Sequence, residues 1–262
     1  MTATNNKLFV ILKPASFWVM WLLLLRLSGA FEGFIPPNIK ACVYGVIGTA
    51  YAFLLTWLYL KSEKKTFRDI GFTFQTKTPL RFLLGVAIGA AIFIAMTALL
   101  LFFGKMHLSF IGTSAANIVQ SIITLFFLAL MEEIAFRSYP FLKLKDNYGL
   151  IVAQLIAAIG FAAYHFAIGW SLQSVLMGPF VWAWVYGLAA VWSRGIAFPT
   201  GLHMMLNIGQ TLTGMSSGAS AVWKIDFSTT VHADTQVILV VMHAVVFLVA
   251  VWLTERTGIN RI

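Results

Sequence analysis

Residues 82–103 read FLLGVAIGAAIFIAMTALLLFF, an apolar run without a single charged side chain. About 20 such residues, wound into an α-helix, cross the hydrocarbon core of a bilayer. The run is continuous rather than alternating, which is typical of a membrane helix and not of a strand in a β-barrel. This stretch therefore predicts a transmembrane helix and indicates the fold class of the whole chain.

The composition of the chain agrees with a membrane protein. Of its 262 residues, 60% are hydrophobic and 10% are charged, whereas soluble domains have about 45–50% apolar and about 25% charged residues. Intrinsic disorder and nucleic-acid binding are excluded, because disordered chains have few apolar residues and nucleic-acid binders carry dense Lys and Arg. The single cysteine, Cys42, excludes a disulfide framework and a cysteine-based zinc site.

Similar apolar windows recur along the chain and predict an all-α polytopic bundle of about eight transmembrane helices. Six or seven crossings plus a re-entrant segment is the alternative. No internal repeat divides the chain, so residues 1–262 are predicted to form a single transmembrane domain. The windows are 14–34, 41–60, 82–103, 115–138, 149–167, 172–192, 195–213 and 235–253.

The basic residues predict the orientation of the bundle. If the N-terminus lies inside, most Lys and Arg fall in inside segments, and the outside segments hold only Lys40, Lys105 and Lys224. Cytoplasmic loops retain positive charge, so both termini are predicted to be cytoplasmic. Compact loops without organelle-targeting signals favour a multi-pass protein of a prokaryotic plasma membrane. The first apolar run is interpreted as a membrane helix rather than a cleaved signal peptide, because it is long and contains Arg26.

Ionisable side chains inside apolar segments indicate where function lies, because each costs several kcal/mol unless it is paired or hydrated. The stretch LFFLALMEEIAFRSYPF places Glu132 beside Glu133. Neighbours on a helix point about 100° apart, so the two carboxylates have different surroundings. Glu133 and Arg137 have the spacing of a helical ion pair, which leaves Glu132 to face a cavity. The alternative is a charge cluster at a helix end that simply reaches water.

Two later segments carry the other candidate residues. GFAAYHFAIGW places His165 among aromatic and small residues, with Phe161 on the same helical face. PTGLHMMLNIGQ places His203 and Asn207 one turn apart, where both could donate hydrogen bonds to a developing oxyanion. Each segment alone is also explained by hydrogen bonds between neighbouring helices. Together, a base, two imidazoles and an amide on three helices favour a catalytic site inside a bundle.

These motifs, in this order, resemble those of a known family. They are EExxxR at 132–137, FxxxH at 161–165 and HxxxN at 203–207. The chain is similar to the CPBP family (CAAX protease and bacteriocin-processing), a group of glutamic intramembrane endopeptidases that includes the Ras-converting CAAX prenyl endopeptidase. The resemblance covers about residues 125–210, because the flanking helices agree only in being hydrophobic. It implies an eight-helix bundle with a water-filled cavity open to the cytoplasmic side.

The resemblance also implies a role for each motif residue and an activity. Glu132 would activate a water molecule as general base, and His165 would help to hold that water. His203 and Asn207 would form the oxyanion hole, and the remaining motif charges would organise the site. The activity implied is hydrolysis of a peptide bond in a membrane-associated or lipid-tethered substrate, within a catalytic core at about residues 115–213. The predicted catalytic residues are Glu132, Glu133, Arg137, His165, His203 and Asn207.

Three alternatives stay open. Two His and two Glu could bind zinc as in a zinc-dependent intramembrane protease, but there is no HExxH helix and Arg137 would compete for a carboxylate. We therefore predict no metal and no cofactor. A membrane immunity or scaffold protein that binds a bacteriocin-like peptide is the non-enzymatic alternative. A proton-coupled carrier ranks third, because no repeat halves are visible.

The remaining expectations concern partners and two further polar residues. The expected partners are the lipid bilayer and a peptide or protein substrate, either lipid-modified or membrane-embedded, with no nucleic acid. Arg26 is expected to reach the surface or pair within the bundle, with a role in admitting substrate as the alternative. His243 is expected to pack or to form a hydrogen bond in the last span.

Overall fold

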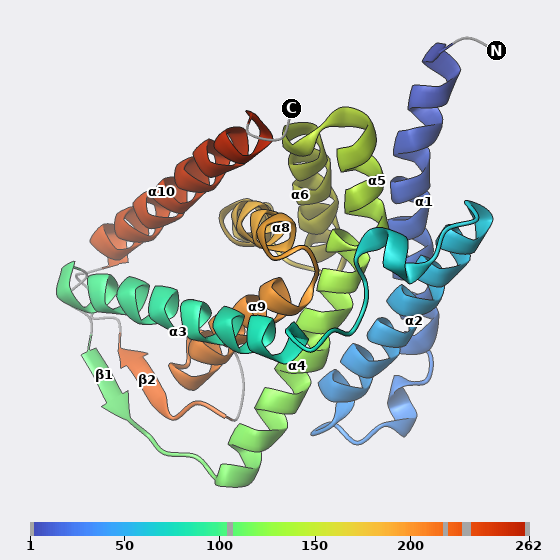
Figure 1. Ribbon diagram of the computed structural model, residues 1–262. Helices are drawn as coiled ribbons and strands as arrows, with labels where there is room; N and C mark the ends of the chain where they lie inside the picture. The colour runs from blue at the N-terminus through green and yellow to red at the C-terminus, as the bar shows by residue number, and fades with distance from the viewer. Residues whose placement is uncertain (1–2, 104–106, 217–219, 227–231, 260–262) are drawn as a thin grey trace.

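The computed structural model describes residues 3–103, 107–216, 220–226 and 232–259, which are almost entirely helical (Figure 1). One small antiparallel ribbon pairs β1 (His107–Phe110) with β2 (Trp223–Asp226). The helices are α1 (Ala3–Gly29), α2 (Lys40–Ser62), α3 (Thr78–Phe103), α4 (Ala115–Arg137), α5 (Tyr139–Tyr148), α6 (Leu150–Ala167), α7 (Leu172–Val175), α8 (Val181–Ser193), α9 (Ala197–Leu212) and α10 (His232–Ile259), with the short turns η1 (Glu32–Phe34), η2 (Phe67–Ile70) and η3 (Leu176–Phe180).

Seven stretches of the described chain are long and apolar enough to cross a membrane, which confirms the predicted all-α polytopic bundle. They coincide with seven of the eight predicted windows. The window at 195–213 contains α9, which has 16 residues. At 1.5 Å per residue, α9 extends about 24 Å, less than the hydrocarbon thickness of about 30 Å. The eighth predicted crossing is therefore a shorter helix packed within the bundle, and the orientation of the termini stays a prediction.

Glycine contacts bring α9 against α3. A Cβ on Gly85 would collide with the carbonyl oxygen of Phe198 near the start of α9, and one on Gly209 would collide with the ring of Phe93. Gly85 and Gly89 have the GxxxG spacing that lets membrane helices approach closely. Residues near the start of α3 contact residues near the start of α9, and later residues of α3 contact later residues of α9. The two helices therefore run parallel and side by side (Figure 1).

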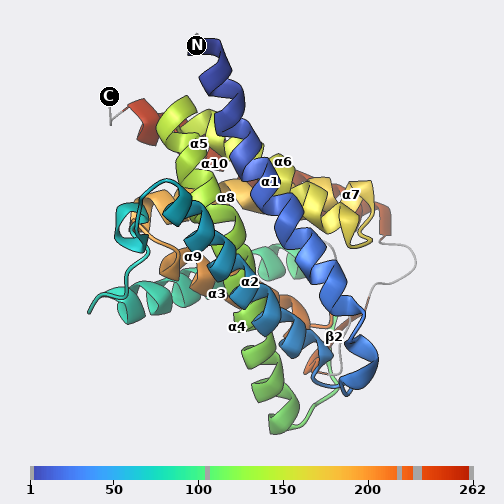
Figure 2. The ribbon, with the colours of Figure 1, turned by 90° about the vertical axis from the view of Figure 1, so that its right-hand side faces the viewer.

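An aromatic core fixes α1, α4 and α6 relative to one another. The ring of Trp21 lies 4.9 Å from that of Tyr164 and 5.8 Å from that of Phe136. Phe136 in turn contacts Phe161, with ring centroids 5.0 Å apart. Trp21 also donates a hydrogen bond to the carbonyl oxygen of Gly48, which brings in α2. The first apolar run is thus an integral part of the bundle. It lies on the side opposite α10 (Figure 1) and crosses the face that is turned to the viewer in Figure 2.

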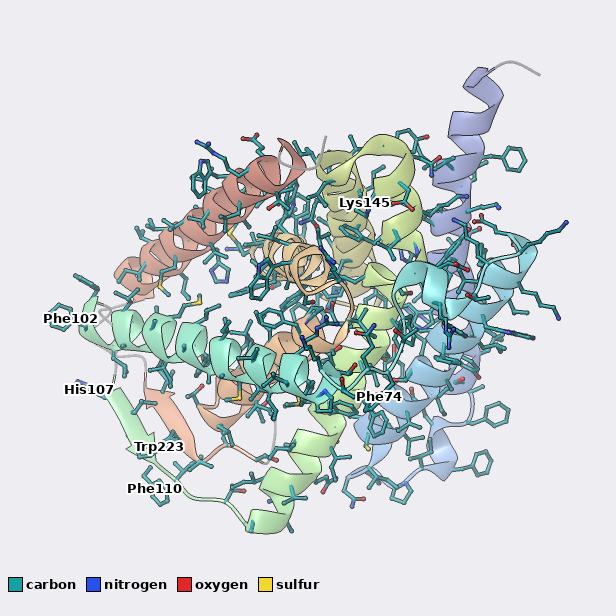
Figure 3. The ribbon with its side chains drawn as sticks, viewed as in Figure 1. Phe74, Phe102, His107, Phe110, Lys145 and Trp223 are labelled. Atoms are coloured by element: carbon teal, nitrogen blue, oxygen red, sulfur yellow. The ribbon has the colours of Figure 1, made fainter. Side chains whose placement is uncertain are left out.

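Apolar side chains cover much of the outer surface. Phe102, Phe110 and Trp223 project from the periphery (Figure 3), and Phe74 and Phe102 are 85% and 79% exposed. Exposed apolar surface on this scale is unfavourable in water and favourable against lipid. The helical bundle therefore has the outside expected of a multi-pass membrane protein.

Candidate active site

Glu132 and Glu133 lie near the carboxyl end of α4, which ends at Arg137. Pro140 follows at the start of α5, and its missing N–H cannot continue the α4 hydrogen-bond ladder. Both carboxylates are buried, with exposures of 8% for Glu132 and 0% for Glu133. The chain therefore places two acidic side chains in its interior directly before a helix break.

The two carboxylates face different partners. Glu133 Oε2 lies 3.6 Å from Arg137 Nε, so the ion pair indicated by their spacing is present. Glu133 Oε1 accepts a hydrogen bond from His203 Nδ1 at 2.9 Å, which ties α4 to α9. Glu132 makes neither of these contacts and instead faces His165 and the other ring nitrogen of His203.

Glu132 lies between two imidazole rings. Its Oε2 is 3.6 Å from His203 Nε2, and its Oε1 is 3.8 Å from His165 Nε2. Both separations exceed an ordinary hydrogen bond but can be bridged by one water molecule. Helices α4, α6 and α9 therefore bring the carboxylate and the two histidines of the separate sequence motifs to one place.

The other ring nitrogens fix how these histidines face Glu132. His165 Nδ1 lies 2.9 Å from the carbonyl oxygen of Phe161, which can only accept, so Nδ1 carries the proton. His203 Nδ1 donates to the Glu133 carboxylate in the same way. In the neutral rings, both Nε2 atoms then present a lone pair toward Glu132. This arrangement suits a donor, such as water, placed between the carboxylate and the rings.

Arg137 is enclosed in the bundle with 2% exposure. It donates a hydrogen bond to the carbonyl oxygen of Ala183, and its guanidinium carbon lies 4.5 Å from the ring centre of Phe161. Arg137 Nε and Nη1 and Glu133 Oε2 have no hydrogen-bond partner among the described residues. The guanidinium is thus held by charge, by one carbonyl and by aromatic faces, and its position fixes Glu133.

Tyr186 on α8 is a residue of this site that the sequence did not reveal. Its ring stacks on that of His203, with centroids 4.3 Å apart and planes 17° apart. The guanidinium carbon of Arg137 also lies over the ring of Tyr186, 5.4 Å from its centre. The segment VWAWVY is aromatic throughout, so nothing in it distinguishes the ring that faces His203 from those that face lipid or other helices.

Asn207 is the predicted site residue that stands apart from these contacts. It lies one turn after His203 on α9 and is partly exposed. Within the described chain its side chain makes no hydrogen bond and no ion pair. Its amide is therefore available to a ligand, and its place in an oxyanion hole stays a prediction.

Arg26 and His243, the two further polar residues singled out in the sequence, have partners within the bundle. Arg26 donates a hydrogen bond to the carbonyl oxygen of Ala167 at the end of α6, so it pairs within the bundle. His243 donates from Nδ1 to the carbonyl oxygen of Leu239 in its own helix, as expected. Neither residue belongs to the group around Glu132, but Arg26 holds the end of the helix that carries His165.

The described residues also bear on metal binding. No group of three or more His, Cys, Asp or Glu side chains among them is arranged to hold a metal ion. Instead, Glu133 and His203 are hydrogen-bonded to each other, and Arg137 forms an ion pair with the second oxygen of Glu133. The absence of a metal and of a cofactor stays a prediction, which a chelator can test.

Comparison with known proteins supports the resemblance that the motifs indicated. Residues 114–209 match the family model described as "Type II CAAX prenyl endopeptidase Rce1-like". No curated protein matches the chain. The matched segment contains all three motifs, so the resemblance to CPBP proteases is confirmed over this part of the chain. The similarity is to a class of CAAX-type intramembrane proteases, which are peptide hydrolases.

Proposed function

We propose that this protein is a metal-independent intramembrane endopeptidase in which Glu132 activates water to hydrolyse a peptide bond. The observation that carries the proposal is the position of Glu132 between His165 Nε2 and His203 Nε2. The family match over residues 114–209 supports the same reaction class. The substrate we propose is a membrane-associated or lipid-tethered polypeptide, because the site is buried among apolar helices.

The reaction would proceed by general-base catalysis. Glu132 would take a proton from a water molecule held near His165 while the water oxygen bonds to the carbonyl carbon of the substrate. The carbonyl oxygen would become an oxyanion. The C–N bond would then break as Glu132 returns the proton to the departing nitrogen. The products would be a carboxylic acid and an amine, and no oxidant or metal is required.

The oxyanion needs hydrogen-bond donors. Asn207 would donate from Nδ2 without changing its charge. His203 would donate from Nε2 only when both ring nitrogens carry protons. The ring would then be positively charged, with the Glu133 carboxylate 2.9 Å from its Nδ1. Removing one oxyanion donor typically lowers the turnover number about 10²–10³-fold. Glu133 and Arg137 would act as positioning residues, because they hold the ring of His203.

The decisive experiment compares Glu132→Gln with a matched control, Glu255→Gln. Glu255 is exposed near the end of α10, so its substitution makes the same chemical change away from the site. Membranes containing each variant would be analysed for newly formed peptide ends by mass spectrometry. Wild type and Glu255→Gln should release the same peptides, and Glu132→Gln should reduce their rate of release about 10²–10⁴-fold.

Two further readings complete this test. The unfolding temperature of purified Glu132→Gln should match that of wild type, which shows that the loss is chemical. A zinc chelator should leave the wild-type rate unchanged, and its inactivation by chelator would contradict the metal-independent mechanism. Cleavage that persists in Glu132→Gln would overturn the role of this residue. Membranes without any wild-type-dependent peptides would favour the immunity or scaffold alternative.

A further inference from the structure

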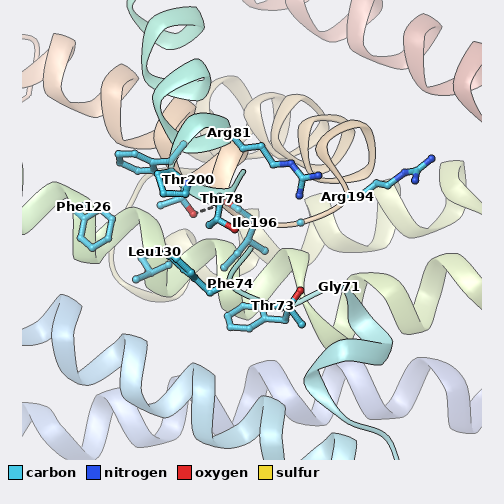
Figure 4. A pocket seen from close by; sticks show the side chains of 15 residues that line it. Gly71, Thr73, Phe74, Thr78, Arg81, Phe126, Leu130, Arg194, Ile196 and Thr200 are labelled. Carbon is cyan, nitrogen blue, oxygen red and sulfur yellow. Dashed lines mark hydrogen bonds between the residues drawn. The ribbon is translucent and has the colours of Figure 1, made fainter. Parts of the chain in front are cut away.

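A pocket lies beside the candidate active site. It has a volume of about 430 Å³ and lies between the start of α3, the middle of α4 and the turn from α8 to α9 (Figure 4). This volume is in the range of small-molecule sites. None of the six predicted catalytic residues lines it. Its apolar wall includes Phe72, Pro79, Phe82, Phe126, Leu130 and Ile196.

The pocket is a neighbour of the site on two helices. Leu130 precedes Glu133 by three residues on α4, and Thr200 precedes His203 by three residues on α9. Residues three apart on a helix lie on the same face. A ligand in the pocket would therefore contact the helix faces that continue into the site, without touching the charged groups of the site.

Two arginines lie at the opening of this pocket. Figure 4 shows the side chain of Arg81 extending toward the turn that carries Arg194, whose own side chain reaches outward from the rim. Arg194 ends α8 in the left-handed conformation, with φ of 54°. Neither arginine makes an ion pair or side-chain hydrogen bond with the described residues. The opening therefore carries two positive charges that are available to an anion.

The depth of these charges matches the headgroup region of a bilayer. Arg81 is in the first turn of α3, and the uncharged run 82–103 follows it directly. A helix of this length spans the hydrocarbon, so the guanidinium of Arg81 lies at one end of the apolar layer. The adjoining loop carries further basic residues, including Lys65, Arg68 and Lys77. Anionic lipids concentrate in the cytoplasmic leaflet, which basic segments of membrane proteins face.

We propose that this pocket binds an anionic phospholipid, with an acyl chain against the apolar wall and the phosphate near Arg81 and Arg194. A zwitterionic lipid would bring a cationic group to the same two arginines. A peptide would bring backbone amides to a wall whose polar side chains are mainly threonines, and unpaired amides are unfavourable there. The lipid would thus be a structural ligand of the helices that carry Glu133 and His203.

A lipid titration measures binding directly and needs no peptide substrate, so its failure is separate from failure of the proposed function. Full-length protein in detergent would be titrated with phosphatidylglycerol and with phosphatidylcholine of the same acyl chains, and bound lipid counted by native mass spectrometry. Wild type should prefer phosphatidylglycerol. The double variant Arg81→Gln/Arg194→Gln should lose about fivefold in phosphatidylglycerol affinity per charge, or about 25-fold in all.

A matched control separates a built site from general attraction to positive charge. Arg68→Gln/Lys77→Gln removes two exposed charges from the same end of the bundle, and neither residue lines the pocket. This variant should lose less than about threefold in affinity. A loss as large as that of the pocket variant, or equal binding of both lipids by wild type, would overturn the proposal.

Two competition arms identify the occupant. Glycerol phosphate, the headgroup without acyl chains, should not displace phosphatidylglycerol, and displacement would show a free-anion site instead. A peptide cleaved by the protein should also leave the lipid bound, and displacement would assign the pocket to substrate. Ala197→Phe adds a ring at the pocket wall and should weaken binding of the lipid if its unfolding temperature matches that of wild type.

Discussion

Two clusters of charged residues in this protein, around Glu63 and around Glu132, differ in how fully the carboxylate is hydrogen-bonded. At the end of α2, a single oxygen of Glu63 accepts hydrogen bonds from Lys13 at 2.5 Å, from Tyr139 at 2.8 Å and from Lys143 at 2.8 Å. In the bundle, the nearest ring nitrogens to Glu132 are 3.6 and 3.8 Å away. One oxygen of Glu63 thus has three donors, whereas neither oxygen of Glu132 lies within hydrogen-bond distance of these rings.

The difference separates a structural carboxylate from a reactive one. The donors to Glu63 come from α1 and α5, so this residue ties three helices together at their ends. A buried polar group with incomplete hydrogen bonding is unusual in folded proteins and is typical of functional sites. Glu133 fits that description because its Oε2 has no hydrogen-bond partner among the described residues. Glu132 fits it because its two oxygens lie 3.6 and 3.8 Å from the nearest ring nitrogens, beyond an ordinary hydrogen bond.

The largest effect on stability is expected at Glu133. Glu133→Gln would leave the buried Arg137 guanidinium without its carboxylate, and breaking a buried ion pair lowers the free energy of unfolding by about 3–5 kcal/mol. Thermal unfolding in detergent measures this loss. Glu132→Gln, one residue away, should change stability by less than about 1 kcal/mol. Equal losses in the two variants would remove the distinction between the two carboxylates.

A smaller loss of stability is expected at Glu63, with peptide hydrolysis unaffected. Glu63→Gln keeps the size of the side chain but weakens three charge-assisted hydrogen bonds. Because the cluster lies at the end of a span close to water, the expected loss is about 1–2 kcal/mol at pH 7. Unfolding temperature and peptide release would be measured on the same preparation. A loss of hydrolysis matching that of Glu132→Gln would contradict the structural assignment.

The pH dependence of this loss follows from the same contacts. Burial alone would raise the pKa of Glu63, but hydrogen bonds from Lys13, Lys143 and Tyr139 outweigh it and lower the pKa from 4.5 to about 2. A carboxyl with a lower pKa in the folded state stabilises the fold above its unfolded pKa. The difference in unfolding temperature between wild type and Glu63→Gln should therefore be constant above about pH 5 and shrink as the pH falls toward 2.

The smallest expected effect concerns Arg26, which acts on the site through α6. Arg26→Ala would remove the hydrogen bond to the carbonyl oxygen of Ala167, two residues after His165. We expect kcat to fall about fivefold with little change in KM, since about 1 kcal/mol of helix-end restraint is lost. Arg26→Lys should recover part of the rate. Lys40→Ala, which breaks a surface ion pair with Glu32, is the control and should have no effect.

Much of the candidate site was predictable because it depends on local spacing. The Glu133–Arg137 pair follows from positions four apart on a helix, and His165 and His203 stood out as polar residues in apolar segments. The contacts between helices were harder to predict from the sequence. Tyr186 stacks on His203 from a segment of similar aromatic residues, and Glu63 meets partners about 50 and 80 positions away in the sequence.

The sequence by itself determined the membrane class, the apolar spans and the polar residues within them, because hydrophobicity and helical period are properties of short segments. Only the tertiary structure decided that Glu132 faces two histidines, that Glu63 joins three helices, and that α9 packs along α3 as a short helix. The physical reason is that the sequence of a membrane helix does not fix its rotation about its own axis. Helices that are apolar on most sides have no strong pattern to show which face turns inward, so close contact between helices chooses it.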